Sequence, residues 1–292
     1  MDAAPPVGTP VTVRRILIAV LVCLSAARSL AGDNYALIVS GASGGAPYSE
    51  KYDGWRIALT KTLKSNFGYP DDHVRSLSEA SRDQVQQALR DLQMRVAKDD
   101  VLFVVLIGHG TDEKFNLVGP DMTAADWSAQ MKPIAGRIVF VDTTSSSFPF
   151  FRQLAAPGRI VITATDSTAQ QFETVFADFF IRAFAEPAAD SDKDGRVSIY
   201  EAFQFATANV RTWFDQHNQL PTERALLNDE EVARATFLQP RAVPANDPTA
   251  KRQAEIESSI ANLRARRSSM PPAAYDAELE RLLIELARLS RP

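Results

Sequence analysis

Cysteine, positive charge and long apolar runs are all scarce in this sequence of 292 residues. The only cysteine is Cys23. A formal net charge of −4 excludes a generally basic protein that binds nucleic acid through its phosphates. Neither a zinc-ligand spacing nor a phosphate-binding loop ending in Gly-Lys-Ser/Thr is present in the sequence. The 45% of residues that are hydrophobic can bury a substantial core, which excludes a disordered chain.

The first 31 residues have the features of a secretory signal peptide. Two arginines precede an apolar run at residues 16–27, and Ser29 and Ala31 give a small-x-small cleavage pattern. The run is shorter than the roughly 20 residues that a membrane-spanning helix needs, so we expect cleavage after Ala31. The mature protein would then be soluble, exported to the periplasm or the extracellular space, and without a membrane span; an uncleaved N-terminal membrane anchor is the alternative. Cleavage also removes Cys23, which excludes disulfides and thiolate catalysis.

Short apolar runs rich in β-branched residues predict buried strands. They occupy residues 35–40, 100–107, 137–141 and 159–163, with a further short strand at 73–77. Strands that are apolar on both sides are typical of a parallel sheet covered by helices on both faces. Helical patterns lie between them, at residues 48–66, 81–96, 124–131 and 148–154. This alternation predicts an α/β fold with a mostly parallel central sheet, in which sites lie at the carboxyl ends of the strands.

The remainder of the chain is dominated by helical patterns. Residues 172–186 and 198–217 predict two helices around a polar loop, which completes a domain of residues 32–240. A proline-rich linker follows at residues 241–248. Residues 249–292 carry two apolar series with steps of four and three, separated by Met-Pro-Pro, which predicts a helical hairpin or short coiled coil. The hairpin lies on the domain, or it forms a surface for self-association or for a partner; the sequence leaves both open.

The strongest chemical pattern is an EF-hand-like loop at residues 190–201, which reads DSDKDGRVSIYE. Carboxylates stand at loop positions 1, 3, 5 and 12, and glycine at position 6 permits the sharp turn that a calcium loop requires. The expected ligands for one Ca²⁺ are the side chains of Asp190, Asp192, Asp194, Ser198 and Glu201 and the backbone carbonyl of Arg196. Sensor proteins usually pair such loops, so a single loop predicts a stabilising ion rather than a switch. The alternative is an acidic turn that caps the next helix.

A histidine and a run of hydroxyl side chains follow two strands that we expect to be neighbours. The strand at residues 100–107 leads into Gly108-His109-Gly110. The strand at residues 137–141 leads into Asp142 and then five threonines and serines, residues 143–147. Because the carboxyl ends of parallel strands share one edge of a sheet, this pattern predicts a general base close to hydroxyl nucleophiles.

These motifs resemble those of the caspase–legumain clan of cysteine peptidases, and legumain-type enzymes most closely. In that clan one apolar strand precedes His-Gly, and a second precedes Asp/Glu-Ala-Cys-x-Ser-Gly. Residues 37–44 (LIVSGASG) are similar to the first strand and loop of legumain-type enzymes. Residues 67–74 (FGYPDDHV) are similar to their Gly-Ile-Pro-Asp-Glu-Gln-Ile segment. The resemblance covers residues 35–185 and implies a caspase/legumain-like sandwich.

The resemblance assigns roles to individual positions. His109 takes the general-base position, Gly110 falls in the oxyanion hole, and Ser43 stands where legumain-type enzymes have an asparagine that orients the histidine. Thr144 stands at the position of the nucleophilic cysteine. A threonine hydroxyl is a far weaker acid than a thiol, and its methyl group crowds attack. The resemblance therefore implies a relative that has lost proteolytic activity.

Three functions remain open on these patterns. We expect an exported, calcium-stabilised pseudo-peptidase that binds a peptide or protein partner through the former catalytic cleft. The alternative is an active hydrolase with Thr144, Ser145 or Ser146 as nucleophile and His109 as general base. A second alternative is an extracellular calcium-dependent structural module, in which the calcium loop and the helical hairpin are the working parts.

Overall fold

The computed structural model describes residues 32–111, 113–240, 248–267 and 270–289. The predicted signal peptide, and all of the predicted linker except its last residue, lie outside the described residues. Within the described part of the chain, no helix has both the length and the apolar character needed to cross a membrane.

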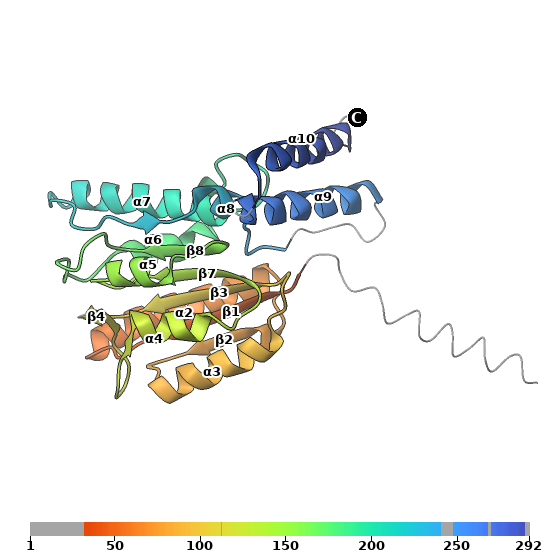
Figure 1. Cartoon of the computed structure of the whole chain (residues 1–292). Helices are drawn as coiled ribbons and strands as arrows, with labels where there is room; N and C mark the ends of the chain where they lie inside the picture. The colour runs from red at the N-terminus through yellow and green to blue at the C-terminus, as the bar shows by residue number, and fades with distance from the viewer. Residues whose placement is uncertain (1–31, 112, 241–247, 268–269, 290–292) are drawn as a thin grey trace, which may run out of the picture. The chain divides into compact units, whose positions relative to one another are not determined.

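A six-stranded sheet runs through the described chain in the order β2-β1-β3-β7-β8-β9 (Figure 1). Its strands are β1 (Asn34–Ser40), β2 (Val74–Leu77), β3 (Val101–Ile107), β7 (Arg137–Asp142), β8 (Arg159–Thr163) and β9 (Leu226–Leu227). The first five are parallel to their neighbours, and β9 is antiparallel to β8. The predicted α/β fold with a mostly parallel sheet is therefore confirmed.

A small antiparallel sheet between β3 and the next helix was not predicted. It consists of β4 (Gly110–Thr111), β5 (Lys114–Phe115) and β6 (Met122–Thr123). Each strand has two residues, which is too short to produce a period-2 pattern in the sequence. The sheet begins at Gly110, so it fixes the chain immediately after His109.

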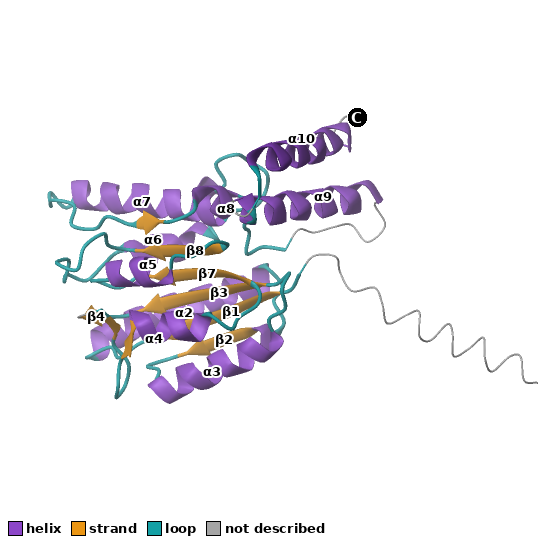
Figure 2. Cartoon of the chain, viewed as in Figure 1, coloured by secondary structure: helices purple, strands orange, loops and turns teal. Residues whose placement is uncertain are grey.

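Helices cover both faces of the large sheet (Figure 2). One face packs against α2 (Ala46–Lys61), α6 (Phe176–Ala183) and α7 (Ile199–Gln216), and the other against α3 (Arg82–Arg95), α4 (Ala124–Met131) and α5 (Phe148–Leu154). Along β3, alternate side chains enter the two clusters: Phe103 and Val105 face the first, and Leu102 and Val104 the second. This is why β3 reads as a continuous apolar run.

The predicted helix at residues 48–66 is correct in place but not in form. It is α2 followed by a π-helical segment, Thr62–Asn66. The predicted helix at residues 172–186 is longer than α6, which begins only at Phe176. The Glu223 carboxylate accepts the backbone N–H groups of Val175 and Phe176 at this point, so a long-range contact sets where the helix starts.

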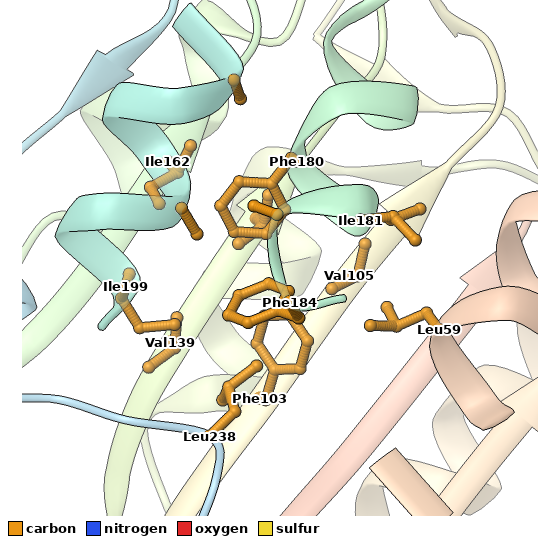
Figure 3. Close-up of a cluster of buried hydrophobic side chains, with 14 of the residues drawn as sticks. Leu59, Phe103, Val105, Val139, Ile162, Phe180, Ile181, Phe184, Ile199 and Leu238 are labelled. Atoms are coloured by element: carbon orange, nitrogen blue, oxygen red, sulfur yellow. The ribbon is translucent and has the colours of Figure 1, made fainter. Parts of the chain in front are cut away.

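The larger core cluster joins the sheet to α6 and α7. Figure 3 shows Phe103 of β3 packed close to Phe180 and Phe184, with Ile199 from the start of α7 nearby. Leu238, which follows α8 (Glu230–Arg234), is fully buried in the same cluster. The last described residues before the linker are therefore held by the domain core.

The predicted helix pair near the C-terminus is present as α9 (Pro248–Ala265) and α10 (Pro272–Leu289). The helices pack through a small apolar cluster with Ile256, Ile260, Leu263, Tyr275 and Leu282 at its centre. Glu231 of α8 contacts the turn end of this hairpin: it forms an ion pair with Arg267 and accepts a hydrogen bond from the Tyr275 hydroxyl.

Candidate functional site

The candidate site lies where β1, β3 and β7 end. In the strand order, β1 and β3 are adjacent and the chain continues from them in opposite directions across the sheet, which is where ligands bind in open α/β folds. β3 also pairs with β7, with Leu106 opposite Asp142. The loop after β1, His109 after β3 and the hydroxyl segment (residues 143–147) after β7 are therefore close, as the sequence predicted.

A cavity of about 880 Å³ opens at this edge of the sheet. Its volume lies within the range of small-molecule and peptide-residue pockets. Its lining is almost entirely polar and comprises His109, Gly110, Thr111, Glu113, Asn116, Ser145, Ser146, Thr168 and Gln171. Ser145 and Ser146 line this cavity together with His109, whereas Thr144 is not part of the lining.

Gly110 allows the chain next to His109 to approach the hydroxyl segment. A Cβ atom at this position would overlap the Thr144 hydroxyl and the Ser145 carbonyl oxygen. Only glycine permits this close approach, so the His-Gly pair is explained by packing as well as by the resemblance.

The His109 imidazole is held by α2 and by the loop after β1. Its Nε2 lies 3.2 Å from the Tyr52 hydroxyl oxygen and 3.2 Å from the Ser43 carbonyl oxygen. The Tyr48 and Tyr52 rings meet it edge-on, at centroid distances of 4.9 and 5.4 Å. Burial, with the nearby Glu173 and Tyr48, raises the pKa of the Tyr52 hydroxyl, so this group stays protonated.

Ser43 contacts the histidine in a way that the resemblance did not imply. Its backbone carbonyl, not its side chain, faces the imidazole. The Ser43 hydroxyl instead donates a 2.5 Å hydrogen bond to Glu79. Ser43 is therefore in contact with His109, but the contact is made by a backbone atom that every residue has.

Thr144 is fully buried, and both of its polar groups are engaged within the protein. Its hydroxyl donates to the Ser145 carbonyl oxygen at 3.0 Å, and its backbone N–H donates to Asp142 Oδ1 at 3.0 Å. No hydrogen bond joins it to His109 in the described part of the chain. Thr144 thus lacks both the exposure and the base that a nucleophile requires.

The two serines that line the cavity donate to backbone carbonyl groups. Ser145 Oγ lies 3.3 Å from the Gly110 carbonyl oxygen, and Ser146 Oγ lies 3.0 Å from that of Gln170. Ser146 also adopts a left-handed conformation with φ of 54°, at a sharp turn between β7 and α5. Such turns cost free energy in residues other than glycine and recur at functional sites.

Asp142 is a buried acid at the start of the hydroxyl segment. Its side chain has no solvent exposure, and its Oδ2 is among the few buried polar atoms without a partner in the described structure. Burial raises the pKa of Asp142 to about 7, although the Thr144 N–H opposes this shift.

The wall of the cavity at residues 166–175 is tied to a second loop. Gln170 Nε2 donates to the Thr222 hydroxyl at 2.9 Å, and Glu223 holds the start of α6. Burial raises the pKa of Glu223 to about 7. Sequence reasoning missed both Glu223 and Tyr52. Tyr52 had a signal, since Tyr48 and Tyr52 are four residues apart on a helix that directly follows the loop after β1.

The acidic loop at residues 190–201 brings three of its predicted ligands together. Carboxylate oxygens of Asp190, Asp192 and Asp194 lie within 4.8 Å of one another. Gly195 has φ of 86°, the left-handed conformation predicted for loop position 6. The backbone N–H groups of Asp194 and Gly195 donate to Asp190, which holds the turn closed.

The remaining predicted ligands are engaged elsewhere in the loop. Glu201 and Ser198 form a capping box at the start of α7, and Glu201 Oε1 also accepts from the backbone and hydroxyl of Ser191. Burial raises the pKa of Glu201, but these hydrogen bonds outweigh it and the net pKa is lowered. The predicted ligand atom of Arg196 is its backbone carbonyl oxygen, and its guanidinium lies over the Phe237 ring at 3.8 Å. In the described residues, the convergent group comprises the three aspartates and not Glu201.

Asp192 carries the electrostatic cost of this convergence. Burial raises its pKa, and the negative charges of Glu201, Asp194 and Asp190 raise it further, against the effect of the Asp194 N–H. A hard cation with oxygen ligands would relieve this repulsion.

A second cavity, of about 510 Å³, lies at the opposite, amino end of the strands. Its two inner arginines bind the protein itself. Arg159 donates to the carbonyl oxygens of Leu154 and Met131, and Arg137 donates to the Thr236 hydroxyl. These contacts explain the arginines structurally, so we place the functional site at the carboxyl edge.

A scan of protein-family models and a search of curated proteins give no match to this chain. The resemblance to the caspase–legumain clan therefore rests on the four sequence motifs alone.

Proposed function

We propose that this protein binds an extended peptide segment in the cavity at the carboxyl edge of the sheet, as an exported and catalytically inactive relative of caspase–legumain peptidases. One observation carries the proposal. His109 and two serines line a polar cavity of about 880 Å³. In the described structure, none of the serine or threonine hydroxyl groups of this lining is hydrogen-bonded to His109, whose ring contacts the Tyr52 hydroxyl and the Ser43 carbonyl oxygen instead.

The chemistry of the lining suits a peptide backbone. Hydroxyl and amide groups predominate, including those of Thr168, Asn116 and Gln171, and Glu113 is the only carboxylate in the lining. Such groups donate to and accept from peptide N–H and C=O groups without requiring a charged ligand. This lining supports the binding of a hydrogen-bonding chain that carries no net charge.

The test is binding of a fluorescent peptide library to the purified protein, measured by fluorescence anisotropy. Gln171→Arg places a bulky charge in the cavity, and we expect it to weaken binding by about 10-fold or more. Gln153→Arg, an exposed substitution near the end of α5, is the matched control and should bind like the wild type. Absence of binding to the wild type at millimolar peptide, or equal weakening by both variants, would refute the proposal.

A hydrolase is the second candidate, and the lining favours the serines over Thr144 as its nucleophile. Ser146 is the better placed by conformation, since nucleophilic serines of other hydrolases stand on strained strand-to-helix turns. Turnover of the same peptides would establish this activity if His109→Ala abolished it while leaving the circular dichroism spectrum unchanged. Turnover that survives in His109→Ala would indicate a contaminant.

Calcium binding is proposed for the acidic loop, with Asp190, Asp192 and Asp194 as the first ligands. The convergent carboxylates and the left-handed Gly195 support it. We propose a stabilising role for the ion, because the loop precedes α7, which packs in the core. If the cavity proves inert, this loop and the helical hairpin would be the working parts of a structural module. Export through the N-terminal segment completes the proposal.

A further inference from the structure

Helix α10 has two apolar faces, of which α9 covers one. Tyr275 and Leu282 are buried against α9. Leu279, Leu286 and Leu289 pack at the edges of this contact, so the covered face follows steps of three and four.

The second face is open. Leu283 and Ile284 are 44% and 45% exposed, the only large apolar side chains of the described hairpin that are this accessible. Together with Leu279 and Ala287 they line a shallow groove of about 370 Å³ along the helix, and Asp276 and Glu280 complete its lining. Two adjacent exposed aliphatic residues on one helix are more than folding of the hairpin itself requires.

The charges beside this groove are arranged in a particular order. Asp276 lies in the first half of α10, Glu280 at its middle and Arg288 near its end. None of the three forms an ion pair or side-chain hydrogen bond within the described residues. Neighbouring charges do: Arg281 pairs with Glu278, and Arg252 of α9 pairs with Glu285. Among the described residues, two acids of the groove lining therefore have no ion-pair partner, and neither does Arg288, which directly follows the last lining residue, Ala287.

We propose that this face packs antiparallel against the same face of a second copy of the chain. A two-fold axis near Leu283 and Ile284 brings Glu280 of each helix opposite the turn that contains Ala287 and Arg288 of the other. Glu280 then meets Arg288 across the contact, twice. A parallel arrangement would instead place acid beside acid, so the charge order selects the antiparallel one.

The small size of the face determines the expected strength. One stripe of four apolar residues buries less than the roughly 1,200 Å² of a standard stable interface. The dimer should therefore be weak and concentration-dependent. Ala287 helps, because a small side chain lets the two helix backbones approach closely.

Sedimentation equilibrium of the purified protein over a concentration series tests the proposal. Ile284→Glu should weaken association by about 10-fold or more. Ile57→Glu is the matched control, since Ile57 is an exposed isoleucine on α2, with 56% exposure. It should leave the dimer unchanged. Circular dichroism of each variant establishes that the helices are retained.

Charge reversal gives an independent readout. Glu280→Arg and Arg288→Glu should each weaken the dimer, and the double variant should restore it at low salt. A monomer at every concentration would overturn the proposal. So would a dimer that is insensitive to Ile284→Glu, because that would place the interface elsewhere. A dimer weakened by Ile284→Glu but not restored by the double variant would overturn the antiparallel arrangement.

Discussion

Two polar loops of this protein differ in how their side chains are satisfied. The hydroxyl segment at residues 143–147 is buried. Most of its hydroxyl groups donate to nearby backbone carbonyl groups, and the Ser147 hydroxyl forms a hydrogen bond with the Thr165 hydroxyl. The acidic loop at residues 190–201 is exposed over residues 191–195, and three carboxylates converge there. Its nearest compensating cation is Arg196, 3.4 Å from Asp194.

The difference indicates what each loop lacks. The hydroxyl segment is complete without a ligand, so its chemistry depends on what enters the cavity beside it. The acidic loop retains uncompensated negative charge, which a bound cation would neutralise. Polar residues of similar number thus produce an internally hydrogen-bonded wall in one place and a cluster of converging carboxylates in the other.

The largest expected effect is a pH dependence of the free energy of unfolding, caused by the burial of Asp142 at the start of the hydroxyl segment. Its folded pKa of about 7 lies above the ordinary value of 3.8, so the folded state holds the proton more tightly. Stability should therefore fall as pH rises from about 4 to about 7 and then level off, by up to about 4 kcal/mol. Asp142→Asn should remove this part of the pH dependence, measured as the difference between the urea unfolding profiles of the two proteins. Parallel profiles from pH 4 to 8 would show that Asp142 is hydrated.

The next largest effect is expected from a substitution that disrupts the contact between β4 and the hydroxyl segment. Gly110→Ala should destabilise the fold by about 3 kcal/mol, because the new Cβ overlaps Thr144 and Ser145. Gly54→Ala is the control, since a Cβ on this helical glycine meets nothing within 4 Å. That change should be neutral or slightly stabilising. Equal denaturation midpoints for the two variants would contradict the close approach.

The smallest of the three effects concerns the acidic loop. Calcium should raise the melting temperature by about 5 °C relative to chelator. Asp192→Asn should abolish the rise, because Asp192 is one of the three convergent carboxylates, whereas Asp215→Asn, which removes one exposed charge from α7, should keep it. Identical melting curves of the wild type in calcium and in chelator would leave the loop as a turn that caps α7.

The sheet was predictable because its strands are buried on both faces. β3, β7 and β8 have no polar interruption, and this continuity identifies parallel strands without knowledge of their neighbours. Thr123 directly precedes the predicted helix at residues 124–131 and caps α4 through a capping box with Asp126. Both features are local, so the sequence contains the whole signal.

The site was predictable only in part. The positions of His109 and the hydroxyl segment followed from strand order, but their contacts depend on distant residues. Tyr52 reaches His109 across 57 positions, and Glu223 sets the start of α6 across 48 positions. No local pattern encodes the contact of Glu223 with the start of α6, which is why α6 was predicted too long. Ser145 lines the cavity and Thr144 does not, although they are adjacent, and this difference likewise follows from the backbone path of the turn.

Leu238, near the end of the domain, contacts the start of the domain, so the domain can be moved into other proteins as a unit. The Leu238 carbonyl oxygen accepts from Asn34 Nδ2 at 3.1 Å and from the Tyr69 hydroxyl at 3.0 Å. The first strand and the last core residue of the domain are therefore neighbours in space. A domain whose two ends meet can be inserted into a surface loop of another protein, or permuted by joining residues 34 and 238 through a short connection, without disturbing the sheet.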